Sequence, residues 1–232
     1  MDRTAGRRPA PDHTADADQS EIYLICQTQI KKKNDVKTDI VLAGVGGQGI
    51  LSIATILGVA ALKDGLNIKQ AEVHGMSQRG GDVQSNLRIS SESISSDLIP
   101  TGMADLIVSL EPMEALRYLP MLSPGGWLVT STAPFINIPD YPDSEAIDTE
   151  IKTVGRAVAF DMEALAKECA SARSSNMVLL GAASPFIDMD AAKIEDAIRS
   201  VFGAKGEAIV ESNIKAFRAG REMASVQAGL SK

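Results

Sequence analysis

The sequence is poor in cysteine, and the two that occur, Cys26 and Cys169, lie far apart without a C-x-x-C spacing. This argues against a disulfide scaffold and against an iron–sulfur cluster or a structural zinc held by this chain alone, so we predict no metal site. Positive charge is not in excess either, because the formal net charge is -7. We therefore expect no binding to nucleic acid or to anionic membranes.

A secretory signal is also missing, because the opening residues carry scattered charges and prolines instead of an apolar core. One span, between Asp39 and Lys63, has no charge and is long enough to cross a bilayer. Glycines and Gln48 interrupt its middle, and a strand, a turn and a buried helix explain this pattern better than a membrane span. We therefore expect a cytoplasmic protein, and 232 residues are enough for one large α/β domain.

The first positive feature is a glycine-rich turn between an apolar strand at residues 40–43 and a helix at residues 50–62. The turn fits the pattern G-x-G-x-x-G. At such a junction unpaired backbone amides favour an anion, and glycines allow positive φ and the close approach of a ligand. The alternative is a tight turn that only permits close packing in the sheet. The candidate cofactor-binding residues of this turn are Gly44, Gly46, Gly47, Gln48 and Gly49.

A second loop, residues 74–81, follows an expected strand at residues 67–73 and combines glycines with polar side chains. Loops at the carboxyl ends of strands bind ligands in open α/β sheets. His74 supplies a possible acid or base and Arg79 a fixed cation, so we predict catalytic roles for both. A solvated turn with a capping histidine is the alternative. The other predicted cofactor-binding residues here are Ser77, Gln78, Gly80 and Gly81.

Glu72 permits a competing interpretation. NAD-binding domains carry an acidic residue near the end of the second strand, where it binds the ribose hydroxyls. A freestanding NAD(P)-binding dehydrogenase is therefore an alternative function. The composition of the second loop argues against it, and no tyrosine of the chain has a lysine four residues later.

The remaining chain alternates short apolar runs with helical segments, as at residues 106–110, 127–130 and 157–160. This rhythm predicts the α/β class, with a Rossmann-like, doubly wound, mostly parallel sheet in a single domain over residues 37–232.

Several further features have structural explanations. Glu111 begins a helix, and Asp161 is expected to cap one. We favour the same capping role for Asn176. Arg88 is expected to face solvent or a partner surface, because nothing local pairs it. Residues 133–147 are rich in proline and predict a long surface loop or a partner-binding excursion.

The two loops together resemble the gamma-type subunit or domain of the 2-oxoacid:ferredoxin oxidoreductases, and among these the indolepyruvate enzymes. Further matches to this family are residues 104–112, 114–117, 125–126 and 176–182. The resemblance covers about residues 37 to 225, and the pair of loops is more specific than either loop alone. It also gives Asn176 a second interpretation, in which its side chain points toward a shared site.

The resemblance implies a subunit that is inactive alone. In the family, thiamine diphosphate serves the oxidative decarboxylation of a 2-oxoacid, iron–sulfur clusters pass the electrons to ferredoxin, and coenzyme A takes the acyl group. This chain has no Gly-Asp-Gly element for thiamine diphosphate and its Mg, and too few cysteines for clusters. These cofactors are therefore expected on a larger partner subunit. The two loops of this chain would contact coenzyme A phosphates or the thiamine-bound intermediate, and a purely structural scaffold is the remaining alternative.

Residues 1–36 lie outside the resemblance, and we predict a disordered or loosely docked N-terminal extension. Residues 21–26 could form a short strand or a docking segment, and Lys31-Lys32-Lys33 reads as a solvated linker.

Overall fold

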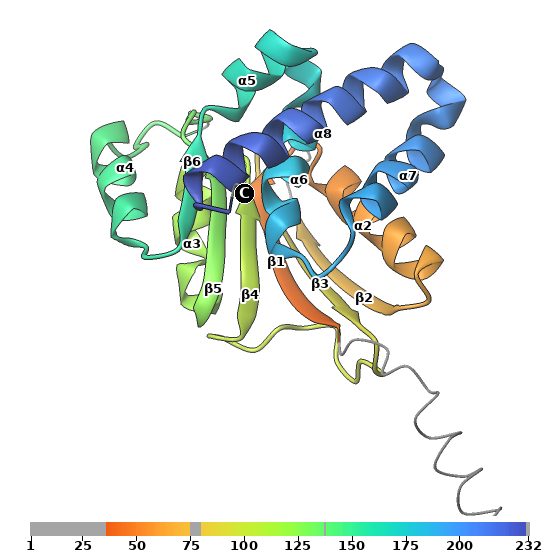
Figure 1. Ribbon diagram of the computed structural model, residues 1–232. Coiled ribbons are helices and arrows are strands. Elements are labelled where there is room, and N and C mark those ends of the chain that lie inside the picture. The colour runs from red at the N-terminus through yellow and green to blue at the C-terminus, as the bar shows by residue number, and fades with distance from the viewer. Residues whose placement is uncertain (1–35, 75–79, 137, 231–232) are drawn as a thin grey trace, which may run out of the picture. The chain divides into compact units, whose positions relative to one another are not determined.

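The computed structural model describes residues 36–74, 80–136 and 138–230 (Figure 1). These residues form a six-stranded sheet with the strand order β2-β3-β1-β4-β5-β6. The strands are β1 (Lys37–Val45), β2 (Asn67–His74), β3 (Asp82–Ser90), β4 (Ala104–Ser109), β5 (Leu122–Ser131) and β6 (Ala157–Phe160). The predicted extension lies outside the described residues except for Val36, so its boundary with the domain stays a prediction.

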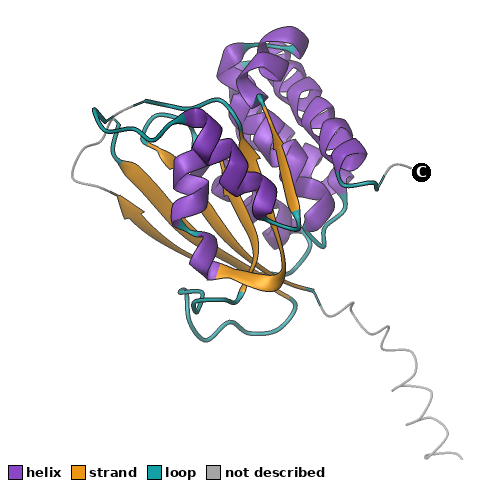
Figure 2. Cartoon of the chain, turned by 90° about the vertical axis from the view of Figure 1, so that its left-hand side faces the viewer, coloured by secondary structure: helices purple, strands orange, loops and turns teal. Residues whose placement is uncertain are grey.

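Helices cover both faces of the sheet (Figure 2). One face packs on α2, α6 and α8, with α5 and α7 beside them, and the other packs on α3 and α4. The helices are α2 (Ile50–Lys63), α3 (Pro112–Arg117), α4 (Ser144–Thr153), α5 (Met162–Cys169), α6 (Ser175–Ala183), α7 (Ala191–Phe202) and α8 (Glu207–Gln227). The predicted α/β class with a doubly wound sheet is confirmed.

The central strands explain why both faces need helices. Successive side chains of a strand point to opposite faces, and β1 and β4 are apolar on both. In β1, Ile40 and Leu42 pack in the cluster with α2 and α6, whereas Val41 packs with α3 and α4. All three side chains are fully buried. A continuous apolar run in the sequence therefore marks a strand at the centre of the sheet.

One strand departs from the parallel pattern. β3 pairs antiparallel with both β1 and β2, whereas the pairs β1–β4, β4–β5 and β5–β6 are parallel. The prediction of a mostly parallel sheet is therefore confirmed. Because β3 returns between β1 and β2, the end of β2 and the start of β3 lie at the same edge as the glycine-rich turn after β1.

Helices α6 and α8 cross in direct backbone contact. A Cβ atom on Gly181 would lie 1.9 Å from the carbonyl oxygen of Phe217, and one on Gly220 would lie 2.0 Å from that of Val178. Real Cβ atoms do not come this close to other atoms, so only glycine fits at either position. The contact holds α6 against both α8 and the sheet.

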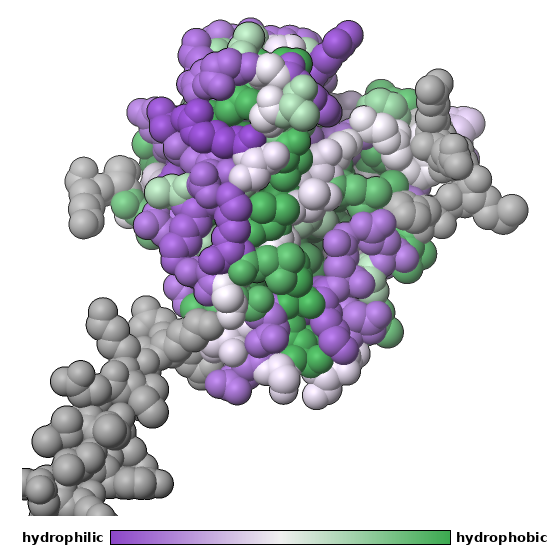
Figure 3. Space-filling view, turned by 90° about the vertical axis from the view of Figure 1, so that its right-hand side faces the viewer, coloured by the Kyte–Doolittle hydropathy of each residue, from purple (hydrophilic) through white to green (hydrophobic). Residues whose placement is uncertain are grey.

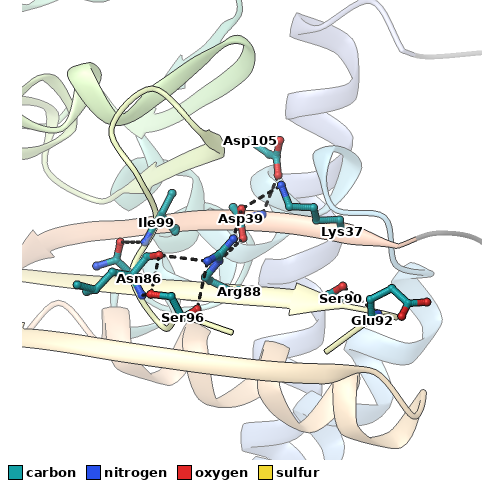
Figure 4. Close-up of polar contacts among 10 residues, drawn as sticks. Lys37, Asp39, Asn86, Arg88, Ser90, Glu92, Ser96, Ile99 and Asp105 are labelled. Atoms are coloured by element: carbon teal, nitrogen blue, oxygen red, sulfur yellow. Dashed lines mark hydrogen bonds and ion pairs between the residues drawn. The ribbon is translucent and has the colours of Figure 1, made fainter. Parts of the chain in front are cut away.

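At the amino end of β1, Asp39 and Arg88 form a buried ion pair (Figure 4). Nε and Nη2 of Arg88 donate to Oδ1 and Oδ2 of Asp39 at 2.7 and 2.9 Å. The remaining Nη1 donates to the carbonyls of Ser96 and Leu98, both at 3.1 Å. The hydrogen bond to Asp39 raises the pKa of Arg88 above its usual value. The expectation that Arg88 faces solvent was wrong, because the register of β1 and β3 places it directly opposite Asp39.

Figure 3 shows the side of the molecule on which α2, α7 and β2 lie, where an apolar band runs between polar flanks. Two ion pairs join the helices there, Lys63 with Asp196 and Lys193 with Asp64, each at 2.6 Å. No helix within the described ranges is long and apolar enough to cross a membrane.

Two local expectations can be compared with the structure. Asp161 does cap a helix, because its Oδ1 accepts from the amide of Ala164 at 2.8 Å. The loop expected over residues 133–147 ends earlier, because α4 begins at Ser144 and buries Ile147 and Ile151. We call residues 132–143 the β5–α4 loop, and all of it except Asn137 is described.

Candidate functional site

The glycine-rich turn lies at the carboxyl end of β1 and requires glycine at three positions. Gly47 and Gly49 have φ angles of 104° and 76°, in the left-handed region that other residues avoid. Gly44 has an ordinary φ, but a Cβ there would lie 2.8 Å from Oε1 of Gln48 and 2.9 Å from Cγ1 of Ile50. The turn is therefore tightly folded against the start of α2.

Several backbone amides of the turn are used internally. The Val45 amide donates to Oε1 of Gln48 at 2.8 Å, and the Gln48 amide donates back to the Val45 carbonyl at 3.1 Å. The Gln48 side-chain oxygen therefore closes the turn. Within the described part of the chain, the amides of Gly47 and Gly49 donate to no partner. These two amides are the candidates for binding an anion at the start of α2.

The second loop is joined to the first through main-chain hydrogen bonds. The Gly46 amide donates to the Gly81 carbonyl at 2.8 Å, and the Gly80 amide donates to the Gly46 carbonyl at 3.4 Å. His74 is the last residue of β2, where its main chain pairs with Val83. The His74 side chain lies outside what the structure describes. Residues 75–79 do too, and with them the predicted site residues Ser77, Gln78 and Arg79.

Asn176 connects the turn to α6. Its Nδ2 donates to the Gly49 carbonyl at 3.3 Å, across 127 residues of sequence. The prediction that Asn176 caps its own helix was wrong, because the N-cap residue is Ser174 and Asn176 lies inside the first turn. Its side chain instead reaches the glycine turn, and the second interpretation, that it points toward a shared site, stays a prediction.

Beside the turn, a cavity of about 190 Å³ opens at the carboxyl edge of the sheet. Its lining includes Gln48 of the turn, Leu110 and Ser131 at the ends of β4 and β5, Pro134 and Phe135 of the β5–α4 loop, and Glu163 of α5. Except for Gln48, these residues were not among the predicted site residues. Leu110 and Ser131 could have been found by the rule that ligands bind beyond the carboxyl ends of parallel strands.

Two buried glutamates lie at the start of α3, which follows the cavity residue Leu110. Glu111 is the N-cap of α3, as expected, since its Oε2 accepts from the Glu114 amide at 2.7 Å. Glu114 pairs with Arg117 at 2.8 Å. Burial raises the pKa of Glu114, and the hydrogen bond from Arg117 opposes this rise. Burial also raises the pKa of Tyr141, and its hydrogen bond to Glu111 adds to the effect.

The geometry does not favour NAD binding through Glu72. In an NAD-binding domain the second strand lies beside the first, so its terminal acid reaches the ribose. Here β3 lies between β1 and β2, so Glu72 is two strands away from β1. Its side chain is exposed and accepts from Nε2 of Gln70.

The described residues contain no group of three or more His, Cys, Asp or Glu side chains arranged to hold a metal ion. Cys169 is a free, half-buried thiol, and Cys26 lies outside the described ranges. One thiolate cannot hold an iron–sulfur cluster, which needs several. These residues do not fit a cluster.

The fold and its glycine-loop edge define a doubly wound α/β domain, and comparison with known proteins identifies the family. The family model described as pyruvate ferredoxin/flavodoxin oxidoreductase matches residues 39–223. The chain belongs to this family and is a subunit of the 2-oxoacid:ferredoxin oxidoreductase class.

Individual relatives show which enzymes within the family this chain is similar to. The indolepyruvate oxidoreductase subunit IorB of Pyrococcus horikoshii is 40% identical over 192 residues, which cover 78% of this chain and 93% of the relative. The corresponding subunit of Thermococcus kodakarensis is 37% identical, with 83% of this chain and 98% of the relative covered. The predicted resemblance to the indolepyruvate enzymes is confirmed.

Solved structures share the fold. The gamma subunit of a keto/oxoacid ferredoxin oxidoreductase from Geobacter sulfurreducens has a TM-score of 0.59 at 26% identity, covering 82% of this chain and 99% of that one. The 2-oxoglutarate:ferredoxin oxidoreductase of Magnetococcus marinus, solved with 2-oxoglutarate, coenzyme A and succinyl-CoA, has a TM-score of 0.65 at 24% identity. That match covers 83% of this chain but 32% of the larger one. A similar domain therefore also occurs within a longer polypeptide.

Proposed function

We propose that this chain is the small subunit of a cytoplasmic enzyme that oxidatively decarboxylates indolepyruvate or another aryl 2-oxoacid. In this reaction the bond to the carboxylate breaks and carbon dioxide leaves. The acyl group forms a thioester with coenzyme A, and the electrons pass singly to ferredoxin. The substrate assignment is supported by the relatives from Pyrococcus horikoshii and Thermococcus kodakarensis, which are named indolepyruvate oxidoreductase subunits.

Thiamine diphosphate, Mg and the iron–sulfur clusters belong to a larger partner subunit in this proposal, because the sequence of this chain has no Gly-Asp-Gly element and only two cysteines. Thiamine diphosphate supplies the chemistry that removes the carboxylate. The isolated small subunit is then inactive. Its contribution is a surface that completes the site of the larger subunit.

The observation that carries the proposal is the pair of main-chain bonds between Gly46 and Gly80–Gly81. They hold the two loops together at the edge where open α/β sheets bind ligands. The amides of Gly47 and Gly49, which have no acceptor within the described ranges, suit a phosphate of coenzyme A. Arg79 adds positive charge and Ser77 and Gln78 add hydrogen bonds, while His74 positions the second loop or transfers a proton.

The same edge carries an apolar surface that suits a protein partner. Phe135, Ile136 and Ile138 of the β5–α4 loop expose 44%, 70% and 41% of their surface. Phe135 also lines the cavity beside Gln48. A subunit that completes the cleft at the glycine turn therefore covers these side chains as well, and their burial contributes to the association.

Replacement of Arg79 tests the site. In the assembled complex, Arg79→Ala is expected to raise the apparent KM for coenzyme A or to lower kcat, because a desolvated cation near a phosphate is lost. Steady-state kinetics with an artificial electron acceptor measure both. Arg156→Ala is the matched control, because Arg156 precedes β6 at the opposite edge and donates to the Gly125 carbonyl. Kinetics that are unchanged in Arg79→Ala would remove this residue from the site.

Two further measurements separate this proposal from its alternatives. Calorimetry of the isolated chain with NAD and NADP is expected to show no binding, and micromolar affinity would favour a dehydrogenase. If variants of both loops leave assembly and activity intact, the chain has only a structural role in the complex. A panel of 2-oxoacids tested on the co-purified complex identifies the substrate, and the proposal expects the highest kcat/KM for aryl compounds.

A further inference from the structure

Glu111 is a carboxylate with no exposed surface, and no basic side chain in the described ranges forms an ion pair with it. A buried charge without a counter-ion is stable only when hydrogen-bond donors surround it. The start of α3 supplies part of this environment, because the Glu114 amide donates to Oε2 at 2.7 Å and the helix dipole favours negative charge. This leaves Oε1 to be satisfied from elsewhere in the fold.

The β5–α4 loop supplies both donors to Oε1. The Phe135 amide donates at 3.4 Å, and the hydroxyl of Tyr141 donates a shorter hydrogen bond. These donors flank the apolar tip of the loop, which contains Ile136 and Ile138. One carboxylate oxygen therefore holds the loop on both sides of its tip. We call this arrangement the Glu111 latch.

The carboxylate and the loop depend on each other. If the loop moved away, Oε1 would remain buried without a donor or would have to draw water into the space, and both are unfavourable. The Tyr141 hydroxyl is protonated at physiological pH, as in any tyrosine, and is therefore able to donate this bond. Ser109 fixes the turn that precedes Glu111, since its Oγ donates to the Glu111 carbonyl at 2.7 Å. The latch is thus built on the rigid end of β4.

We infer that Glu111 is a positioning residue, which holds the β5–α4 loop so that its apolar tip is presented to the larger subunit. The inference rests on the proposed function only for the identity of this partner. The tip lies next to the cavity that includes Gln48, so the same subunit can cover the tip and complete the cleft. A preformed tip associates more tightly than a mobile one, because less conformational entropy is lost on binding.

Tyr141→Phe is the most selective test, because it removes one hydroxyl and keeps the aromatic ring. Amide hydrogen exchange in residues 132–143 of the isolated chain is expected to rise about tenfold, the usual consequence of losing a hydrogen bond to a charged group. The dissociation constant for the larger subunit is expected to rise severalfold, whereas kcat at saturating larger subunit stays unchanged. Glu111→Gln is expected to shift both quantities in the same direction.

Two control variants separate positioning from general stability and from direct contact. Asp190→Ala removes another helix N-cap, since Asp190 accepts from the Ala192 amide at 3.0 Å, and it should leave exchange in the β5–α4 loop and the dissociation constant unchanged. Ile136→Ser should raise the dissociation constant without changing exchange, because the side chain is exposed and makes no part of the latch.

Wild-type exchange in Tyr141→Phe would overturn the inference, and so would faster exchange with an unchanged dissociation constant. If Glu111→Gln fails to fold, Tyr141→Phe still tests whether Glu111 positions the loop. Unchanged kinetics of Arg79→Ala would remove that residue from the site, and the proposed function itself fails separately if no larger subunit co-purifies. In that case the exchange measurement on the isolated chain still tests whether the latch holds the loop.

Discussion

The two ends of the sheet differ in how completely their polar groups are hydrogen-bonded. At the amino end, Asp39 receives two hydrogen bonds from Arg88, and its own amide donates to Oδ2 of Asp105 at 2.8 Å. The third guanidinium nitrogen is used by two backbone carbonyls. At the carboxyl end, the amides of Gly47 and Gly49 have no acceptor among the described residues, and a cavity opens beside them.

This contrast separates residues that hold the fold from residues that can bind something else. Satisfied, buried polar groups stabilise one arrangement, and removing one partner leaves the other uncompensated. Unsatisfied groups at a concave edge are available to a ligand. Substitutions at the amino end should therefore change mainly stability, whereas those at the carboxyl end should change binding as well.

The largest effect is expected for Arg88→Met at the amino end. The variant leaves Asp39 with 2% side-chain exposure and, among the described residues, only the half-exposed Lys37 as a charged partner, so the free energy of unfolding should fall by about 3–5 kcal/mol. Urea denaturation measures this loss. The control Lys37→Met removes an exposed partner at 3.2 Å and should lower stability by less than about 1 kcal/mol. Equal losses in the two variants would contradict the assignment of Asp39 and Arg88 as the central pair.

A smaller effect is expected for Gly49→Ala at the carboxyl end. The left-handed φ should cost about 1–3 kcal/mol, and the new Cβ would lie 2.7 Å from Nδ2 of Asn176. Gly47→Ala isolates the strain, because its Cβ would meet nothing within 4 Å. In an Asn176→Ala background the two glycine substitutions should therefore become similar in their effect on unfolding. If the two glycine variants still differ in stability in the Asn176→Ala background, Asn176 is not the side chain that clashes with a Cβ at position 49.

The smallest effect concerns the pH dependence of stability at Glu114. Its folded pKa is raised by burial, so the folded state binds a proton more strongly than the unfolded state. This contribution to stability is present at low pH and is lost as pH rises above about 4.5 through the folded pKa. Glu114→Gln should remove the loss, so denaturation curves of variant and wild type should diverge over this window in favour of the variant. Parallel curves would contradict the raised pKa.

Arg117→Met sharpens the same measurement. The hydrogen bond from Arg117 lowers the pKa of Glu114 and partly offsets the effect of burial. In Arg117→Met the folded pKa of Glu114 should therefore rise further. The pH range over which stability is lost should then extend to higher pH. The same window in both proteins would show that the pair contributes little to the folded pKa of Glu114.

Local patterns were sufficient to predict the central strands, the glycine turn and the Asp161 cap. Each of these depends on residues close together in sequence: an uncharged apolar run, a G-x-G-x-x-G spacing, or an acid three residues before the amide that it accepts from. The mostly parallel order followed from the alternation of strands and helices. The resemblance to the family rested on two loops, and the family model matched residues 39–223.

Features that depend on strand order and long-range contacts were not predictable in this way. The insertion of β3 between β1 and β2 brings Arg88 opposite Asp39 and separates Glu72 from the glycine turn. Asn176 was assigned to its own helix because its partner, Gly49, is 127 residues away. The Glu111 latch joins the end of β4 to Tyr141, 30 residues later. No local pattern signals such a pairing.

The crossing at Gly181 and Gly220 has a consequence for the glycine turn. Since neither helix can move past the other without a steric clash, the C-terminal helix α8 fixes the position of α6. Its first turn carries Asn176, which touches Gly49. The geometry of the glycine-rich turn is thus set partly by the C-terminal helix, and a library randomised at these two crossing positions should return glycine alone among its folded members.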